Sequence, residues 1–355
     1  MDRIFSSVRR NYIQVLLLVT AVLWAGIRVG PQFMDTALLT YARSWPAPGL
    51  GEGAIYFRSS PLGPVLTQGI SVAGYMFVHV LAITVFLGLA FTWLFLVSPP
   101  ALRLTGFRVF VLSPVVAVLL LHIGLYDAFT CVAIALVMLA WLSNSRWLIL
   151  ISAIPLGFQH FEQGIVLWIV WLLAFSSTRD QLSIPLRSLS FPWAAFPGLI
   201  LGKVILSLAL LGQGLSPFEG RSSVFLEWLT YSLRMNVGKT PFILWGSLLG
   251  LWILLYFAWS RSAYTRNRIY LVSAVAVAFV FSFMTIDNIR VMTVVTIPLT
   301  LLLIVSWLVR RDTCPRQGDN ATEALFWLIP PYVSFPIPAD QWVSFIGEIR
   351  NFVRI

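Results

Sequence analysis

The chain has 355 residues, of which 59% are hydrophobic and only 11% are charged. Because soluble globular proteins carry about 25% charged residues, this composition excludes an ordinary soluble domain. It indicates an all-α protein with many membrane spans. The net charge of +10 would suit a nucleic-acid partner, but the arginines concentrate in short segments between apolar runs, a pattern that orients spans in a membrane.

The first apolar segment, 12–30, should stay in the protein, because residues 13–29 lack a small-x-small cleavage site. An outer loop, 31–68, follows. Its start, PQFMDTALLTYARSW, has apolar residues at helical spacing and predicts an amphipathic helix. Asp35 lies at the front of that helix, where it could be a general base or metal-binding carboxylate. The alternative is a solvated acid favoured by the helix dipole. Arg58 is a cation of the same loop.

Nine further spans follow along the chain. We expect them at 69–97, 109–125, 126–143, 147–159, 161–177, 191–212, 241–260, 269–286 and 291–309. Two full spans need about forty residues, so the hairpins 109–143 and 147–177 are too short. Their outer turns should lie below the lipid surface, against protein or a water-filled cavity.

The outer turn of the first hairpin carries Tyr126 and Asp127. An aspartate in the first helical turn is an ordinary N-cap. Its depth favours a functional reading, because a buried cap could have been serine or threonine without the charge. Ionisable groups inside a membrane protein are candidates for the functional site.

The second hairpin has its turn in GFQHFEQG, which contains Gln159, His160, Glu162 and Gln163. These residues suit recognition of substrate hydroxyls, a proton relay between the histidine and the glutamate, or a metal site. The alternative is a turn that satisfies its own hydrogen bonds. A metal held by His160 with two histidines of other spans, His79 and His122, lacks the tight ligand spacing of known sites.

A second long outer loop, 213–240, contains SVFLEWLTYSLRM, another amphipathic stretch. Outer cations that could hold an anionic head group are Arg58, Arg221, Arg234 and Lys239. Asp287 and Arg290 precede the last span at (i, i+3) spacing and can form an ion pair; alternatively, Arg290 binds a phosphate through bidentate hydrogen bonds. Lys203, inside span 191–212, is either structural or substrate-facing.

Arginine counts set the orientation. With the N-terminus in the cytoplasm, the inner segments carry sixteen arginines against seven acids, whereas the outer segments carry seven charges of each sign. The positive-inside rule then predicts an inner-membrane protein with both termini in the cytoplasm. Residues 1–311 form the transmembrane domain. The tail, 312–355, ends in QWVSFIGEIRNFVRI, which predicts an interfacial helix on membrane lipids.

This arrangement resembles the GT-C-type glycosyltransferases and the related bacterial polysaccharide polymerases. The resemblance rests on the outer loop with its early acid, Asp35, on the loop helix and further spans, and more loosely on YDAFT, HFEQ and DNIR. Thr36 follows Asp35, so the paired acids common in that family are missing. The resemblance implies a polyprenyl-phosphate-linked sugar donor, a glycan or lipid acceptor, and transfer on the extracytoplasmic face.

On this hypothesis a carboxylate, Asp35 first, deprotonates the acceptor and arginines hold the donor phosphate. The catalytic candidates are Asp35, Asp127, Glu162 and His160. The substrate-binding candidates are Arg290, Asp287, Tyr126, Gln159, Gln163, Arg58, Arg221, Arg234 and Lys239. No cofactor is expected, with a divalent metal left open.

The alternative is a transporter or flippase of a lipid-linked or anionic sugar, in which the same acids carry protons. Transport predicts polar groups at several depths and often repeated halves. The acids beside the spans gather on one face and no strong repeat is visible, so the sequence favours the enzyme.

Overall fold

A computed structural model describes residues 2–29, 45–46, 58–217, 221–285, 287–314 and 318–329 of the protein. This part is all-helical and contains no β-strand. The first group of helices comprises α1 (Asp2–Val29), α4 (Leu62–Thr67), α5 (Val72–Val97), η1 (Pro100–Leu102), α6 (Arg103–Val111), α7 (Pro114–Leu121), α8 (Asp127–Leu142) and α9 (Arg146–Thr178). The second group comprises η2 (Arg179–Gln181), α10 (Ile184–Arg187), α11 (Ala195–Leu211), α12 (Arg221–Val237), α13 (Thr240–Leu248), α14 (Leu251–Arg261), α15 (Thr265–Phe283), α16 (Asn288–Val295), α17 (Ile297–Thr313) and α18 (Gly318–Leu328).

The helices follow the predicted apolar segments closely, which is typical of a helical membrane protein. By length and composition alone, three helical segments of the described residues could cross a membrane: α5, α15 and the segment 146–181 that begins with α9. The number of candidate spans rises to as many as six if each of the bent pairs α6–α7, α13–α14 and α16–α17 counts as one span. The segment 241–260, predicted as one span, bends by 87° between α13 and α14.

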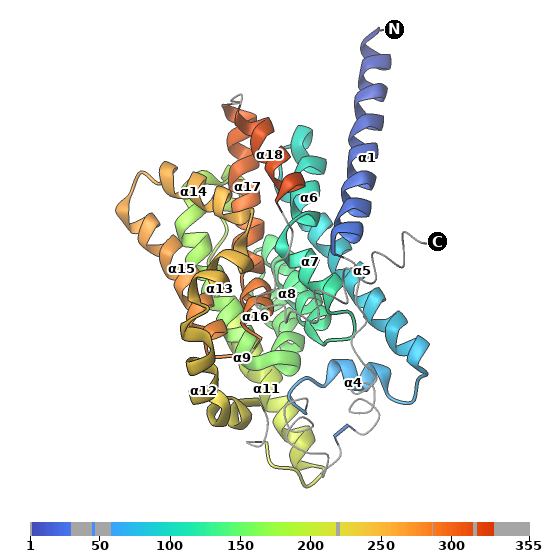
Figure 1. Cartoon of the computed structure of the whole chain (residues 1–355), viewed down its shortest axis with the longest axis vertical. Helices are drawn as coiled ribbons and strands as arrows, with labels where there is room; N and C mark the ends of the chain where they lie inside the picture. Colours follow the sequence, from blue (N-terminus) through green and yellow to red (C-terminus); the bar gives the residue numbers. More distant parts are fainter. Residues whose placement is uncertain are drawn as a thin grey trace.

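The two ends of the molecule differ in character (Figure 1). At one end, drawn at the bottom, lie α4, α12 and the C-terminal end of α11; we call it the loop end. At the other end lie α18 and the C-terminal part of α17, with Arg310 and Arg311 in its last turn; we call it the arginine end. The N-terminal end of α1 also projects at this side. The arginine-bearing end of α17 therefore lies opposite α4 and α12, the described helices of the two predicted outer loops.

The helix labelled α9 reverses direction at His160. His160 has an extended backbone, with φ −158° and ψ 71°. A Cβ atom built on Gly164 would lie 3.3 Å from Cγ of Leu156, whereas residues eight apart in a straight helix are separated by about 12 Å. The chain therefore forms a helical hairpin with its turn at His160, within the sequence GFQHFEQG that predicted it.

This hairpin is held by close packing against α11. Three glycines allow it: a side chain on Gly157 would strike the carbonyl of Leu199, and side chains on Gly198 and Gly202 would strike carbonyls of the hairpin's first arm. Small residues let helix backbones approach closely in membranes, where van der Waals contact drives association. The tip of the hairpin is thereby fixed against the middle of α11.

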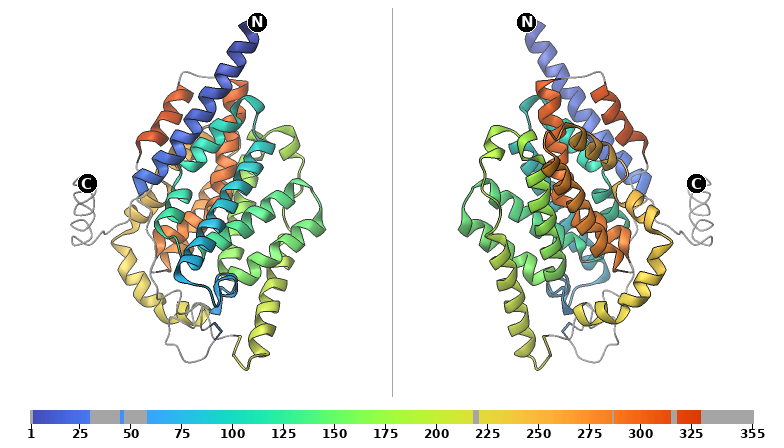
Figure 2. Two further views of the ribbon diagram at one scale, coloured as in Figure 1. Left: turned by 90° about the vertical axis from the view of Figure 1, so that its right-hand side faces the viewer. Right: turned by 90° about the vertical axis from the view of Figure 1, so that its left-hand side faces the viewer.

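The hairpin tip lies well short of the end of α11. Glu162, just past the turn, pairs with Lys203, and α11 continues through 204–211, which adds about 12 Å. Figure 2 shows α11 extending to the lowest part of the molecule. The turn is therefore recessed from the loop end, and its depth below the lipid surface stays a prediction.

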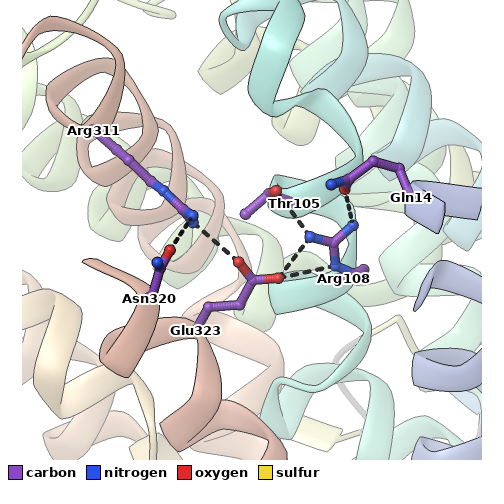
Figure 3. A network of polar contacts seen from close by, with 6 residues as sticks. All are labelled: Gln14, Thr105, Arg108, Arg311, Asn320 and Glu323. Atoms are coloured by element: carbon purple, nitrogen blue, oxygen red, sulfur yellow. Dashed lines mark hydrogen bonds and ion pairs between the residues drawn. The ribbon is translucent and has the colours of Figure 1, made fainter. Parts of the chain in front are cut away.

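One helix was not predicted. Residues 312–355 were predicted to form a tail, but α18 packs against the body: Phe326 is buried beside Gly250, in the bend between α13 and α14. Polar contacts from α18 reach α6 and α17 (Figure 3). The predicted interfacial helix near the C-terminus and the predicted helix of the first loop both lie outside the described residues.

Candidate functional site

The densest charge cluster of the loop end joins α8 to the start of α16. Nη1 of Arg290 donates a hydrogen bond to Oδ2 of Asp127, and Nε of Arg290 donates to Oδ2 of Asp287 at 2.5 Å. The side chains of Asp127 and Arg290 are 5% and 12% exposed, whereas that of Asp287 is 47% exposed. The (i, i+3) pair predicted from the sequence is therefore present, and Asp127 joins it. Two carboxylates share one guanidinium.

Asp287 lies between α15 and α16, outside both helices. Partial removal from water raises the pKa of its carboxyl. The charge of Arg290 and the hydrogen bond from Arg290 together lower the pKa by more than this, so the net shift of the Asp287 pKa is downward. Asp287 is consequently held as a carboxylate at ordinary pH.

Asp127 does not act as an N-cap. Tyr126 occupies the N-cap position of α8, and Asp127 is the first helical residue. The carboxylate gains from the positive end of the helix dipole and contacts Arg290 from α16, 163 residues further along the chain. The extra charge, which a serine or threonine cap would lack, is used in this contact.

The tip of the α9 hairpin meets the same turn. Nε2 of Gln159 donates to the carbonyl of Tyr126 at 3.4 Å, and Oε1 of Gln159 accepts from the backbone N–H of Leu62 at 2.8 Å. Gly63, in α4, lies so close to the Tyr126 ring that a side chain there would overlap it. Three segments distant in sequence therefore converge beside Asp127, with the fully buried Gln159 side chain joining two of them to the hairpin.

An aromatic group from α5 supports this turn and was not predicted. Oη of Tyr75 donates to the carbonyl of Gly124 at 2.5 Å. The ring of His79 stacks on Tyr126 with centroids 6.0 Å apart and meets Phe129 edge-on at 5.1 Å. The spacing of Tyr75 and His79, four residues apart in an apolar helix, places both on one face and could have indicated the group.

The remaining residues of the hairpin tip are divided between the core and the surface. His160 and Gln163 are buried. Glu162 faces α11, where its Oε1 lies 3.5 Å from Nζ of Lys203, and that ammonium also lies 5.7 Å from the Phe161 ring. The described contacts thus give Lys203, left open by the sequence, a partner on the hairpin.

The predicted outer cations that the structure describes differ in burial. Arg58 is buried, Arg234 is exposed, and Lys239 is half-buried at the N-cap of α13. Within the described part of the chain, neither Arg234 nor Lys239 makes an ion pair with the Asp127 cluster. Asp35 and the side chain of Arg221 lie outside the described residues.

Among the described residues, no three His, Cys, Asp or Glu side chains gather so that they could hold a metal ion. Comparison of the chain with protein-family models, with curated proteins and with solved structures finds no match. The chemistry of the site rests on its own residues: the carboxylate of Asp127 in contact with the guanidinium of Arg290, and a second carboxylate, Asp287, half-exposed beside them.

Proposed function

We propose that the protein is a GT-C-like membrane glycosyltransferase or polysaccharide polymerase that uses a polyprenyl-phosphate-linked sugar. The observation that carries the proposal is the Asp127–Arg290–Asp287 cluster, where a base and a phosphate-binding group are in contact at a buried position. The proposal includes about ten spans in the inner membrane, with the loop end on the extracytoplasmic face. The arginine counts support this orientation.

The chemistry requires one bond to form and one to break. The acceptor hydroxyl oxygen bonds to the anomeric carbon of the donor, and the bond from that carbon to the phosphate oxygen breaks, with its electron pair leaving on the phosphate. Asp127 accepts the hydroxyl proton, and Arg290 stabilises the charge on the departing phosphate. Guanidinium groups suit this role because they bind phosphate oxygens in a bidentate manner.

The ion pairs of the cluster give the donor a way to release the base. In the structure Arg290 is shared by Asp127 and Asp287. A phosphate that takes over the hydrogen bonds of Arg290 frees the Asp127 carboxylate, which then lies beside the reacting centre. Asp35, the acid highlighted by the family resemblance, is the alternative base.

A transporter or flippase of a lipid-linked or anionic sugar is the second candidate. The observation that favours it is the excess of carboxylate over guanidinium in the cluster, because an acid that exchanges partners can carry a proton. The two candidates differ in what happens to the substrate: the enzyme changes it chemically, whereas the transporter moves it intact.

The test uses purified protein in liposomes with a polyprenyl-phosphate sugar and a glycan acceptor. Asp127→Asn keeps the side chain's size and removes the base, so transfer should fall about 10²–10⁴-fold. Asp312→Asn, the same change at an exposed position of the arginine end, is the matched control and should keep wild-type turnover.

Asp35→Asn is assayed in parallel. Loss of transfer in Asp35→Asn with wild-type turnover in Asp127→Asn would move the role of base to Asp35. No transfer by the wild type with any lipid-linked sugar, together with proton-coupled movement of such a sugar across the liposome, would replace the enzyme by the transporter.

A further inference from the structure

Asn236, near the C-terminal end of α12, connects that helix to the turn that carries the charge cluster. Its side chain is buried. Nδ2 donates to the carbonyls of Phe283 at 2.7 Å and Thr285 at 2.9 Å, and Oδ1 accepts from Nδ2 of Asn288 at 2.8 Å. A single amide therefore makes three hydrogen bonds to the junction of α15 and α16.

The bonds meet a specific need of that junction. The last carbonyls of a helix have no intrahelical partner, and α15 ends at Phe283. Asn236 supplies the missing donor from another helix. Its acceptor oxygen binds Asn288, the first residue of α16. The end of one helix and the start of the next are therefore fixed to the same side chain.

The junction determines where the ionic groups lie. Asp287 directly precedes Asn288, and Arg290 follows it by two residues, in the first turn of α16. A rotation of this first turn would move the guanidinium away from Asp127 on α8. Misplacement by about 1 Å can cost 10²-fold in rate, so a device that fixes the turn bears directly on transfer.

We infer that Asn236 is a positioning residue: through the α15–α16 junction it holds Arg290 against Asp127. The expected effect of Asn236 on sugar transfer rests on the proposed function, which this role deepens. The coupling of α12 to the α15–α16 junction does not depend on the proposed function. No local pattern indicates this role, because Asn236 is a single polar residue that directly follows the amphipathic stretch SVFLEWLTYSLRM.

The first experiment measures backbone hydrogen exchange of residues 284–290 in detergent-purified protein. In Asn236→Ala the carbonyls of Phe283 and Thr285 and the side-chain amide of Asn288 lose their partner. Backbone exchange in this segment should therefore rise about tenfold. Asn236→Asp, which keeps the acceptor but loses the donor, should behave similarly. The matched control is Asn267→Ala: Asn267 is also buried, lies at the other end of α15 and donates to Asp180 at 3.0 Å.

The second experiment measures transfer from the polyprenyl-phosphate sugar. Asn236→Ala should lower kcat/KM about tenfold in the wild-type background and have little further effect in an Arg290→Lys background, because the residue acts through Arg290. A purely structural asparagine would lower both backgrounds equally.

Each outcome bears on a different claim. Unchanged exchange at 284–290 in Asn236→Ala, or an equal rise in Asn267→Ala, would overturn the coupling whatever the activity. Equal losses of transfer in both backgrounds would overturn the positioning role. A third outcome combines two results: exchange rises only in the Asn236 variants, and the wild-type protein transfers no lipid-linked sugar. That outcome would retain the coupling of α12 to the junction and reject the proposed function.

Discussion

Two clusters of buried charge lie at opposite ends of the molecule, and their compositions are opposite. At the loop end, two carboxylates share Arg290. At the arginine end, two guanidinium groups share the carboxylate of Glu323: Arg108 donates at 2.6 and 2.9 Å, and Arg311 donates at 3.0 Å (Figure 3). One cluster carries an excess of negative charge and the other an excess of positive charge.

The surroundings of the arginine-end cluster complete its hydrogen bonding. Gln14 of α1 and Thr105 of α6 accept from Arg108 at 2.5 and 3.0 Å, and Asn320 of α18 accepts from Arg311 at 2.8 Å (Figure 3). These contacts join α1, α6, α17 and α18. A network whose donors are met by neighbouring helices fixes a structure.

The loop-end cluster is open by comparison. Its second carboxylate, Asp287, is half-exposed, and its negative charge exceeds its positive charge. An anion or a hydroxyl that approaches from solvent can therefore compete for Arg290 or meet a carboxylate. Clustered charge thus supports two roles: the closed cluster should govern stability, and the open one should govern chemistry. Substitutions at matched positions test this contrast.

Glu323→Ala should give the largest change in stability. It leaves Arg108, a buried arginine, without its carboxylate, and the loss of one partner of a buried pair costs about 3–5 kcal/mol. Thermal unfolding can be followed by dye labelling of the buried Cys131 in a Cys314→Ser background. Transfer per folded molecule should stay near wild type. A stability unchanged relative to the Asp312→Asn control would show that α18 is not held by this network.

Identical arginine-to-lysine changes at the two ends should have opposite readouts. Lysine keeps the charge and loses the planar guanidinium geometry. Arg108→Lys should lower the free energy of unfolding by about 1–3 kcal/mol with little effect on transfer. Arg290→Lys should lower transfer about tenfold, chiefly through a higher donor KM, with a smaller effect on unfolding. Both variants are measured by the labelling and transfer assays above. The same pattern at both ends would remove the distinction between them.

The sequence predicted the local features of this molecule well. Apolar runs located the helices, and the shortness of the segment 147–177 predicted the reversal at His160. The spacing of Asp287 and Arg290 indicated their pair. Each of these features depends on residues that are close in the chain, and hydrophobic periodicity and span length report on such features directly.

Contacts between distant segments were not predictable. The bond from Asp127 to Arg290 and those from Asn236 to the α15–α16 junction depend on how helices pack, which no local pattern encodes. The amide of Gln159 joins α4 to the Tyr126 turn, which no local pattern predicted, and its role in recognising substrate hydroxyls stays a prediction. The helix α18 was missed because its short, mixed sequence lacks the length of a span.

The pair between Glu162 and Lys203 should give the smallest effect and sharpens the comparison from its middle. Its atoms are 3.5 Å apart, and both side chains are about one-quarter exposed (23% and 26%), so the pair is neither closed like the Glu323 network nor as deeply buried as Asp127. Partly exposed ion pairs contribute about 0–1 kcal/mol. Lys203→Gln and Glu162→Gln should each change the free energy of unfolding by less than about 1 kcal/mol, and the double variant should behave like either single one.

Transfer should remain within about twofold of wild type, because the ammonium contacts the hairpin and not the Asp127 cluster. A large loss of transfer in Lys203→Gln, without a matching loss in stability, would show that this lysine meets the donor itself, and the loop end would then hold a second functional charge beyond the open cluster.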